Sequence, residues 1–188
     1  MKKTILLAVT GSISAYKAAD LTSQLGKLGF NVEVLMTKNA TAFITPLTLQ
    51  SLSKNQVHLD VMKEPDVTVI NHIELAKRAD LFLVAPATAN IIGKLANGIA
   101  DDVVSTVALA LKTEVPKLIA PAMNTYMYQN PITQRNLKIL KEVGYTEIDP
   151  REALLACGDF GRGALATIEE ITKVVLNILS TSEASYEK

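Results

Sequence analysis

The stretch "TILLAVTGSISAYKAADLTSQLGKLGFNVEVLM", residues 4–36, decides the fold class. It opens with a short, mostly apolar run over residues 4–9, which is typical of a strand buried on both faces of a parallel sheet. A helical stripe of apolar residues over 14–28 follows and stops at Gly29, a common residue after a helix C-terminus. Residues 31–36 then predict a second strand. Strand, helix and strand in this order predict two parallel strands joined by a right-handed crossover.

The rest of the chain repeats this alternation. Further strands are expected at 81–85, 117–121 and 145–149, and further helices at 89–96, 101–111, 131–143 and 168–179. Residues 39–66 are less regular and predict two short helices broken near Pro46, then an edge strand in "QVHLDV". We therefore predict an α/β fold, a doubly wound parallel sheet in a single domain over residues 1–180, followed by a polar tail over 181–188.

Composition narrows the class of protein. The 188 residues are 48% hydrophobic, and 19 basic side chains balance 19 acidic ones, so neither a disordered chain nor a nucleic-acid partner is expected. The N-terminal apolar run is too short for a signal peptide or a membrane span, and the single cysteine excludes an internal disulfide. One cysteine and two separated histidines have no chelating spacing, so no metal is expected. These features predict a cytoplasmic protein with no membrane partner.

Small polar residues follow the predicted strands, where ligands bind in open α/β sheets. The first such loop lacks the glycine patterns of dinucleotide sites and P-loops. Gly11, Ser12 and the start of a helix can still present N–H groups and hydroxyls to one phosphate. The alternative is a tight turn with Ser14 as the helix N-cap. Thr37 places another hydroxyl at the end of the second strand.

Two later loops carry uncharged groups. Pro86, Thr88 and Asn90 suit a flat, largely uncharged heterocycle, although a capped helix that stops at Gly98 would explain the same residues. Asn124 follows another strand, and its amide can donate to a carboxylate without titrating. The neighbouring methionines and tyrosines, residues 123–128, line a pocket or belong to the core.

The two histidines have different expected settings. His58 falls in the irregular segment and is predicted to be an exposed or half-buried strand residue. His72 begins a predicted helix, where the positive end of the helix dipole favours a neutral imidazole that is able to take a proton.

The only cysteine lies in an unusual place. Cys157 is followed within six residues by Gly158, Gly161 and Gly163, which let the backbone adopt open and closed forms. A core cysteine would instead sit inside a helix or strand. We predict a mobile flap that carries a thiol over a pocket, with the thiol as acid, nucleophile or redox group.

In order along the chain, five motifs resemble the homo-oligomeric flavin-containing cysteine decarboxylases. The motifs are "TGSISAYKA" (10–18), "NHIELAKRAD" (71–80), "APATAN" with "GKLANGIADD" (85–102), "PAMNTYMY" (121–128) and "ACGDFGRGA" (156–164). The resemblance implies a Rossmann-like fold, assembly as a homotrimer or a multiple of trimers, and FMN bound between subunits.

The resemblance also implies roles for individual residues. His72, Asn124 and Cys157 match the catalytic positions, and Ala122 and Met123 join Asn124 at the substrate. The implied FMN site consists of Gly11, Ser12, Thr37, Pro86, Thr88, Ala89 and Asn90, with Ser105 and Thr106 as further candidates. Two departures are Tyr128, where the family has tryptophan, and Arg162, which is displaced within the flap motif. The second departure leaves the group that meets the substrate phosphate open.

The implied activity is FMN-dependent decarboxylation of 4′-phospho-N-pantothenoylcysteine to 4′-phosphopantetheine in coenzyme A biosynthesis. The substrate is first oxidised by the flavin to a thioaldehyde with help from His72, and it loses carbon dioxide while Asn124 orients its carboxylate. Cys157 then protonates the enethiol carbon as the reduced flavin returns the hydride. The chain resembles the stand-alone form, with a separate synthetase upstream in the pathway. The alternatives are a peptidyl-cysteine decarboxylase, a non-catalytic FMN-binding regulatory subunit and a flavin prenyltransferase.

Overall fold

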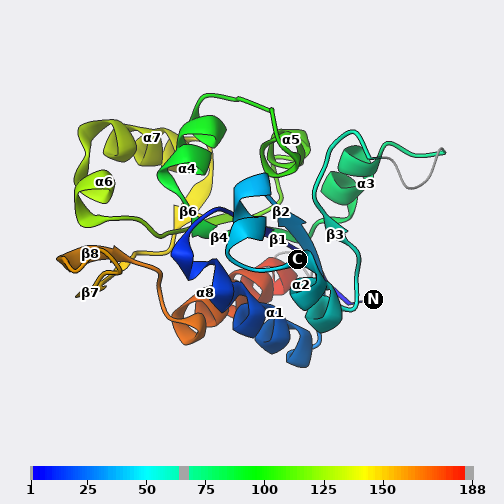
Figure 1. Ribbon diagram of the computed structural model, residues 1–188. Helices are drawn as coiled ribbons and strands as arrows, with labels where there is room; N and C mark the ends of the chain where they lie inside the picture. Colours follow the sequence, from blue (N-terminus) through cyan, green and yellow to red (C-terminus); the bar gives the residue numbers. More distant parts are fainter. Residues whose placement is uncertain (1, 64–67, 185–188) are drawn as a thin grey trace.

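The computed structural model describes residues 2–63 and 68–184, with side chains to residue 180 (Figure 1). Residues 185–188 of the predicted polar tail lie outside the described residues. The preceding helix continues to Ala184, past the predicted boundary at residue 180.

The predicted doubly wound sheet is confirmed. Six parallel strands lie in the order β3-β2-β1-β4-β5-β6. Their bounds are Thr4–Val9 (β1), Asn31–Met36 (β2), Val57–His58 (β3), Leu81–Ala87 (β4), Lys117–Pro121 (β5) and Tyr145–Glu147 (β6). The order reverses between β1 and β4, and the carboxyl ends of strands at such a reversal form a crevice that can hold a ligand.

Helices cover both faces of the sheet (Figure 1). Their bounds are Ile13–Lys17 (η1), Ala18–Lys27 (α1), Lys38–Ala42 (η2), Pro46–Ser53 (α2), Asn71–Arg78 (α3), Ala89–Ala96 (α4), Val103–Ala110 (α5), Thr125–Gln129 (α6), Pro131–Glu142 (α7) and Ile168–Ala184 (α8). Along β1, Ile5 and Leu7 pack in the cluster that includes α1 and α8, whereas Leu6 packs in the cluster on the opposite face. Burial on both faces explains the continuous apolar run.

Some local predictions need correction. The helix expected over 14–28 begins as the 3-10 turn η1, and Ser12 rather than Ser14 is the N-cap, because the Ser12 hydroxyl accepts from the backbone N–H of Ser14. The predicted flap is an antiparallel hairpin of β7 (Arg151–Leu154) and β8 (Phe160–Ala164). The short helix α6 was not expected.

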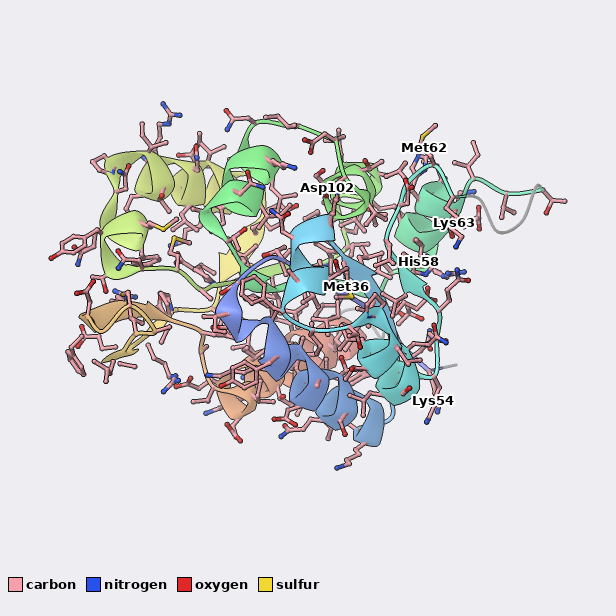
Figure 2. All side chains as sticks on the ribbon, in the orientation of Figure 1. Met36, Lys54, His58, Met62, Lys63 and Asp102 are labelled. Carbon is pink, nitrogen blue, oxygen red and sulfur yellow. The ribbon has the colours of Figure 1, made fainter. Side chains whose placement is uncertain are left out.

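The edge strand β3 holds a buried polar cluster. His58 is 8% exposed, so the expectation of an exposed or half-buried residue was wrong. Its Nε2 lies 3.6 Å from Glu33 Oε2, and Arg78 donates to the same carboxylate oxygen at 2.6 Å. Figure 2 shows His58 close to α3 and Met36 nearer the middle of the molecule. The cluster joins β2, β3 and α3 and fixes α3 at this edge of the sheet.

Across the part of the chain that the structure describes, no helix combines the length and the apolar character needed to cross a membrane.

Candidate active site

Thr10 connects the carboxyl ends of β1 and β4, the two strands between which the sheet order reverses. Its buried hydroxyl donates to the carbonyl oxygen of Pro86 at 2.6 Å and accepts from the backbone N–H of Thr88 at 3.1 Å. The Thr88 hydroxyl in turn accepts from the backbone N–H of Ile91 at 3.3 Å and caps α4. The N-terminus of α4 therefore faces the carboxyl edge of the sheet, where its remaining N–H groups can meet a ligand.

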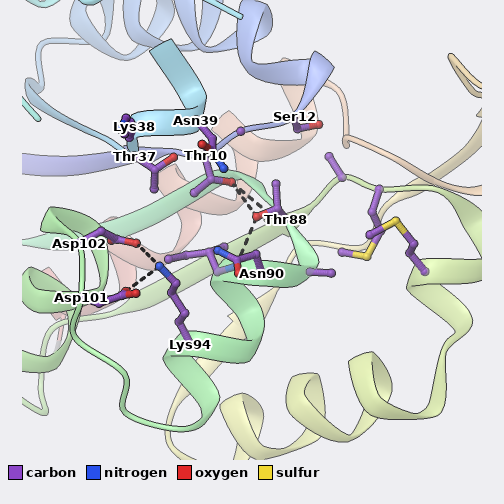
Figure 3. A pocket seen from close by; sticks show the side chains of 16 residues that line it. Thr10, Ser12, Thr37, Lys38, Asn39, Thr88, Asn90, Lys94, Asp101 and Asp102 are labelled. Atoms are coloured by element: carbon purple, nitrogen blue, oxygen red, sulfur yellow. Dashed lines mark hydrogen bonds and ion pairs between the residues drawn. The ribbon is translucent and has the colours of Figure 1, made fainter. Parts of the chain in front are cut away.

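A cavity of about 540 Å³ opens at this point and is called the first cavity (Figure 3). Six of the predicted cofactor residues line it, namely Gly11, Ser12, Thr37, Thr88, Ala89 and Asn90. Residues that the sequence did not single out also line it, among them Thr10, Asn39, Lys94, Asp101 and Asp102. A position directly after a strand was the available signal for Thr10.

Two features show that the first cavity suits a polar cofactor such as FMN. The Thr37 hydroxyl is buried and has no hydrogen-bond partner in the protein, although buried hydroxyls normally have one. At Gly11, a Cβ would lie 2.6 Å from the Cβ of Asn39, so only glycine lets this loop approach η2 so closely. A bound group that accepts or donates at Thr37 would satisfy the hydroxyl.

Three predicted cofactor residues lie outside the lining of the first cavity within the described chain. Pro86 contributes its carbonyl to Thr10 instead. Ser105 completes a capping box with Asp102 at the start of α5, with its backbone N–H 2.9 Å from Asp102 Oδ1. Thr106 follows it in the same helix and donates its N–H to the Asp102 carbonyl at 2.9 Å. Their contact with a cofactor stays a prediction.

Lys94 places a charge-paired cluster on the wall of the first cavity (Figure 3). Its Nζ lies 2.6 Å from Asp101 Oδ1 and 2.8 Å from Asp102 Oδ2. Burial alone would lower the pKa of Lys94, but hydrogen bonds with both carboxylates outweigh burial and raise it. Burial would raise the pKa of Asp102, and its bonds with Lys94 and Ser105 lower it instead. The ion pairs therefore favour the charged forms of Lys94 and Asp102, and they connect α4 to the loop that precedes α5.

A second cavity of about 400 Å³ adjoins the first and shares Ser12, Ala122 and Met123 with it. It holds both Asn124 and Cys157. The Asn124 Nδ2 lies 3.2 Å from the Cys157 sulfur, so the structure brings these two predicted catalytic residues together.

The hairpin that carries Cys157 is anchored beside Asn124 by its backbone. Met123 donates its N–H to the carbonyl of Gly163 at 2.9 Å. A Cβ at Gly163 would collide with the Met123 carbonyl oxygen, and the φ of +155° also favours glycine. At the tip, Gly158 has a φ of +90° and donates to the Leu155 carbonyl. The glycines thus permit a close approach and a tight turn, which is why Cys157 lies over the second cavity.

Arg162, the displaced arginine of the flap motif, contacts protein groups. It pairs with Asp149 at 2.9 Å and lies over the Tyr128 ring at 5.5 Å. Burial, and then the hydrogen bond to Glu147, raise the pKa of Tyr128 to about 12. Tyr128 therefore stays neutral, and its aromatic ring packs against Arg162 of the hairpin. Among the described residues that line the second cavity, the cations are Lys17 and Arg151.

His72 lies away from both cavities. It is the second residue of α3, and it is absent from the described residues that line either cavity. Helix α3 and the β7–β8 hairpin are at opposite sides of the molecule in Figure 1. Its Nδ1 is buried without a hydrogen-bond partner. One copy of the chain therefore does not bring His72 to Cys157.

Comparison with known families and proteins fits this geometry. The family described as Flavoprotein matches residues 1–180. A protein of Streptococcus mutans named probable phosphopantothenoylcysteine decarboxylase is 63% identical over 175 residues, which cover 93% of this chain and 98% of that relative. The coenzyme A biosynthesis bifunctional protein CoaBC of Bacillus subtilis is 51% identical over 172 residues, which cover 92% of this chain and 42% of that relative.

Solved structures of flavin-dependent decarboxylases also resemble this chain. A cysteine-to-serine mutant of PPC decarboxylase, complexed with pantothenoylaminoethenethiol, superposes with a TM-score of 0.81 and 33% identity, and the match covers 100% of both chains. The FMN-dependent cysteine decarboxylase SpaF superposes with a TM-score of 0.82 and 30% identity over 95% of this chain and 97% of that one.

Proposed function

The chain belongs to the Flavoprotein family, and on that premise we propose that it decarboxylates 4′-phospho-N-pantothenoylcysteine with the help of FMN. The product is 4′-phosphopantetheine, and the reaction is a step of coenzyme A biosynthesis. One observation carries the proposal most directly. Asn124 and Cys157, which are 33 positions apart, meet in a cavity that adjoins the first cavity.

Residues of the first cavity would hold the cofactor. The N–H groups at the start of α4, together with Ser12 and the unpartnered hydroxyl of Thr37, offer hydrogen bonds to phosphate and ring oxygens. Gly11 leaves room for this approach. Bound FMN supplies the two-electron chemistry that a cysteinyl group needs before it can lose carbon dioxide.

Residues of the second cavity would act on the substrate. The Asn124 Oδ1 already accepts from the backbone N–H of Tyr126 at 2.8 Å, so its Nδ2 is the side that is offered to the substrate carboxylate. Lys17 and Arg151 would attract the phosphate end of the substrate. Cys157 would give its proton to the enethiol carbon after carbon dioxide leaves.

His72 would take part from another copy of the chain. The imidazole would accept a proton during the oxidation step, which requires it to reach the second cavity. Because α3 and the hairpin lie at opposite edges of one molecule, we propose a homotrimer, or a multiple of trimers, in which neighbouring copies complete the site. A synthetase upstream in the pathway would supply the substrate. We expect a cytoplasmic enzyme.

The purified protein tests the proposal. It should carry the absorption of oxidised FMN, and anaerobic mixing with phosphopantothenoylcysteine should release carbon dioxide and phosphopantetheine, identified by mass spectrometry. A peptide that ends in cysteine is the comparison substrate. Preference for the peptide would point to a peptidyl-cysteine decarboxylase, and FMN binding without turnover of either compound would point to a regulatory subunit.

A further inference from the structure

The Asn124 amide that should receive the substrate carboxylate is already occupied by the hairpin. Its Nδ2 donates to the Cys157 sulfur at 3.2 Å and to Asp159 Oδ2 at 3.1 Å. Its Oδ1 is held by the backbone N–H of Tyr126, so the amide cannot turn over to free its donors. An amide nitrogen has two N–H donors, and both are directed at residues of one turn.

In this cluster of Asn124, Cys157 and Asp159, only Asp159 has no role in the proposed reaction. It lies two residues after Cys157, and the Cys157 thiol donates to the same Oδ2 at 3.4 Å. The backbone fixes this arrangement, because Leu155 donates its N–H to the Asp159 carbonyl at 2.8 Å and so closes the turn. The carboxylate is thus held at the position on Asn124 where another carboxylate would bind.

We propose that Asp159 is a positioning residue that acts as an internal stand-in for the substrate carboxylate at Asn124. This inference rests on the proposed function. The substrate carboxylate displaces Asp159 from the Asn124 Nδ2, because two carboxylates do not share one donor without strong repulsion. The turn that carries Cys157 moves with Asp159, since both side chains contact the same amide.

The exchange couples two steps of the reaction. While the substrate carboxylate is present, Asp159 and the Cys157 thiol are held away from Asn124. Loss of carbon dioxide empties the position, and Asp159 returns to the amide. Its return brings the Cys157 thiol back over the cavity at the stage when the enethiol carbon needs a proton. Cys157 is thereby kept from the substrate before decarboxylation.

Equilibrium binding of two unreactive ligands tests the exchange without turnover. Phosphopantothenoylalanine keeps the carboxylate and lacks the thiol, and phosphopantothenoylethylamine lacks both. Both would be titrated into the FMN-loaded protein by calorimetry. Asp159→Asn and Asp159→Ala remove the competing charge, so we expect the carboxylate ligand to bind about threefold to tenfold more tightly and the ethylamine ligand to bind as it does to the wild type. Glu152→Gln, which removes an exposed carboxylate from β7 of the same hairpin, is the matched control and should change neither.

Two results would overturn the inference. Unchanged affinity for the carboxylate ligand in both Asp159 variants would mean that Asp159 does not compete at Asn124. Weaker binding of that ligand would mean that Asp159 supports the substrate instead. Thermal unfolding of each variant checks that the fold is kept. Because asparagine and alanine differ in size, the test can still be made with one variant if the other does not fold. Failure of the wild type to decarboxylate phosphopantothenoylcysteine would contradict the proposed function. That result can be told apart from failure of the exchange, because the activity assay does not involve the variants.

Discussion

The Asn124 side-chain nitrogen and the Cys157 sulfur lie 3.2 Å apart, although 33 positions separate the two residues in the sequence. Asn124 caps α6 after β5, and Cys157 lies at the tip of the β7–β8 hairpin. Their contact places a neutral hydrogen-bond donor and a proton donor at the same end of the second cavity. The carboxylate and the carbon to be protonated are adjacent in a cysteinyl substrate, so this spacing matches the task of each group.

Replacement of Cys157 by serine should stop the reaction after decarboxylation. A serine hydroxyl is a far weaker acid than a thiol, so protonation of the enethiol carbon fails and the oxidised enethiol product accumulates. Anaerobic turnover followed by mass spectrometry would detect a product two hydrogens lighter than phosphopantetheine. Full conversion to phosphopantetheine by the variant would contradict the assignment of Cys157 as the proton donor.

Thr37→Val should weaken FMN binding. The Thr37 hydroxyl is buried in the first cavity without a protein partner, so a bound cofactor is its expected partner. Loss of that hydrogen bond should raise the dissociation constant for FMN about tenfold, measured by quenching of flavin fluorescence in the reconstituted protein.

Thr172→Val is the matched control for this change. The Thr172 hydroxyl is also buried and unpartnered, but it lies on α8, outside the described lining of the first cavity. Equal FMN affinity for the Thr37 variant and the Thr172 variant would show that Thr37 does not touch the cofactor.

Mixing two inactive variants should restore activity if the site is shared between copies. His72→Asn removes the imidazole on α3, and Cys157→Ser removes the thiol on the hairpin at the other side of the molecule. In co-expressed mixed oligomers, about a quarter of the sites would combine an intact His72 with an intact Cys157 from a different copy. Phosphopantetheine formation would report these sites. Absence of phosphopantetheine in mixed oligomers would show that His72 and Cys157 of different copies do not form one site.

The ion pair at Glu33 should make stability depend on pH. Burial would raise the pKa of Glu33, but the interactions of its carboxylate with His58 and Arg78 outweigh burial and lower the pKa from 4.5. Because the folded pKa is depressed, the stabilisation is complete above pH 4.5 and is lost as the pH falls through the folded pKa. Glu33→Gln should therefore lower the free energy of unfolding by about 2 kcal/mol at neutral pH.

Denaturant unfolding across the pH range measures this effect. The difference between Glu33→Gln and the wild type should shrink as the solution is acidified below pH 4.5. Glu74→Gln, which removes a partly exposed carboxylate that pairs with Lys77 on the surface of α3, serves as the control and should change stability little. A difference at Glu33 that stays constant with pH would show that packing, rather than the charge, is lost.

Local sequence patterns were enough to predict much of the sheet. The bounds of β1, β2 and β5 agree with the predicted strands, because residues buried on both faces form continuous apolar runs. The ends of parallel strands meet at one edge, so strand-end residues such as Gly11, Thr37 and Asn90 could be predicted to gather there, and they line one cavity.

The hairpin and the short helix α6 escaped prediction because their sequences carry no strong periodicity. Strands β7 and β8 are mostly half-buried and form no continuous apolar run, so no alternation of apolar and polar residues marks them. Their position depends on backbone contacts between Gly163 and Met123, which are 40 positions apart by residue number. The glycine at position 163 is the only feature of the sequence that indicates this contact.

The sequence by itself determined the alternation of strands and helices, the class of fold and the residue types of the site, since burial and capping act on neighbouring residues. Only the tertiary structure decided which of those residues meet. It joined Asn124 to Cys157 and Asp159, and it placed α3, the helix that contains His72, at the opposite side of the molecule. The reason is that strand order in the sheet and the close backbone approach at Gly163 are set by packing between segments that are far apart in the chain.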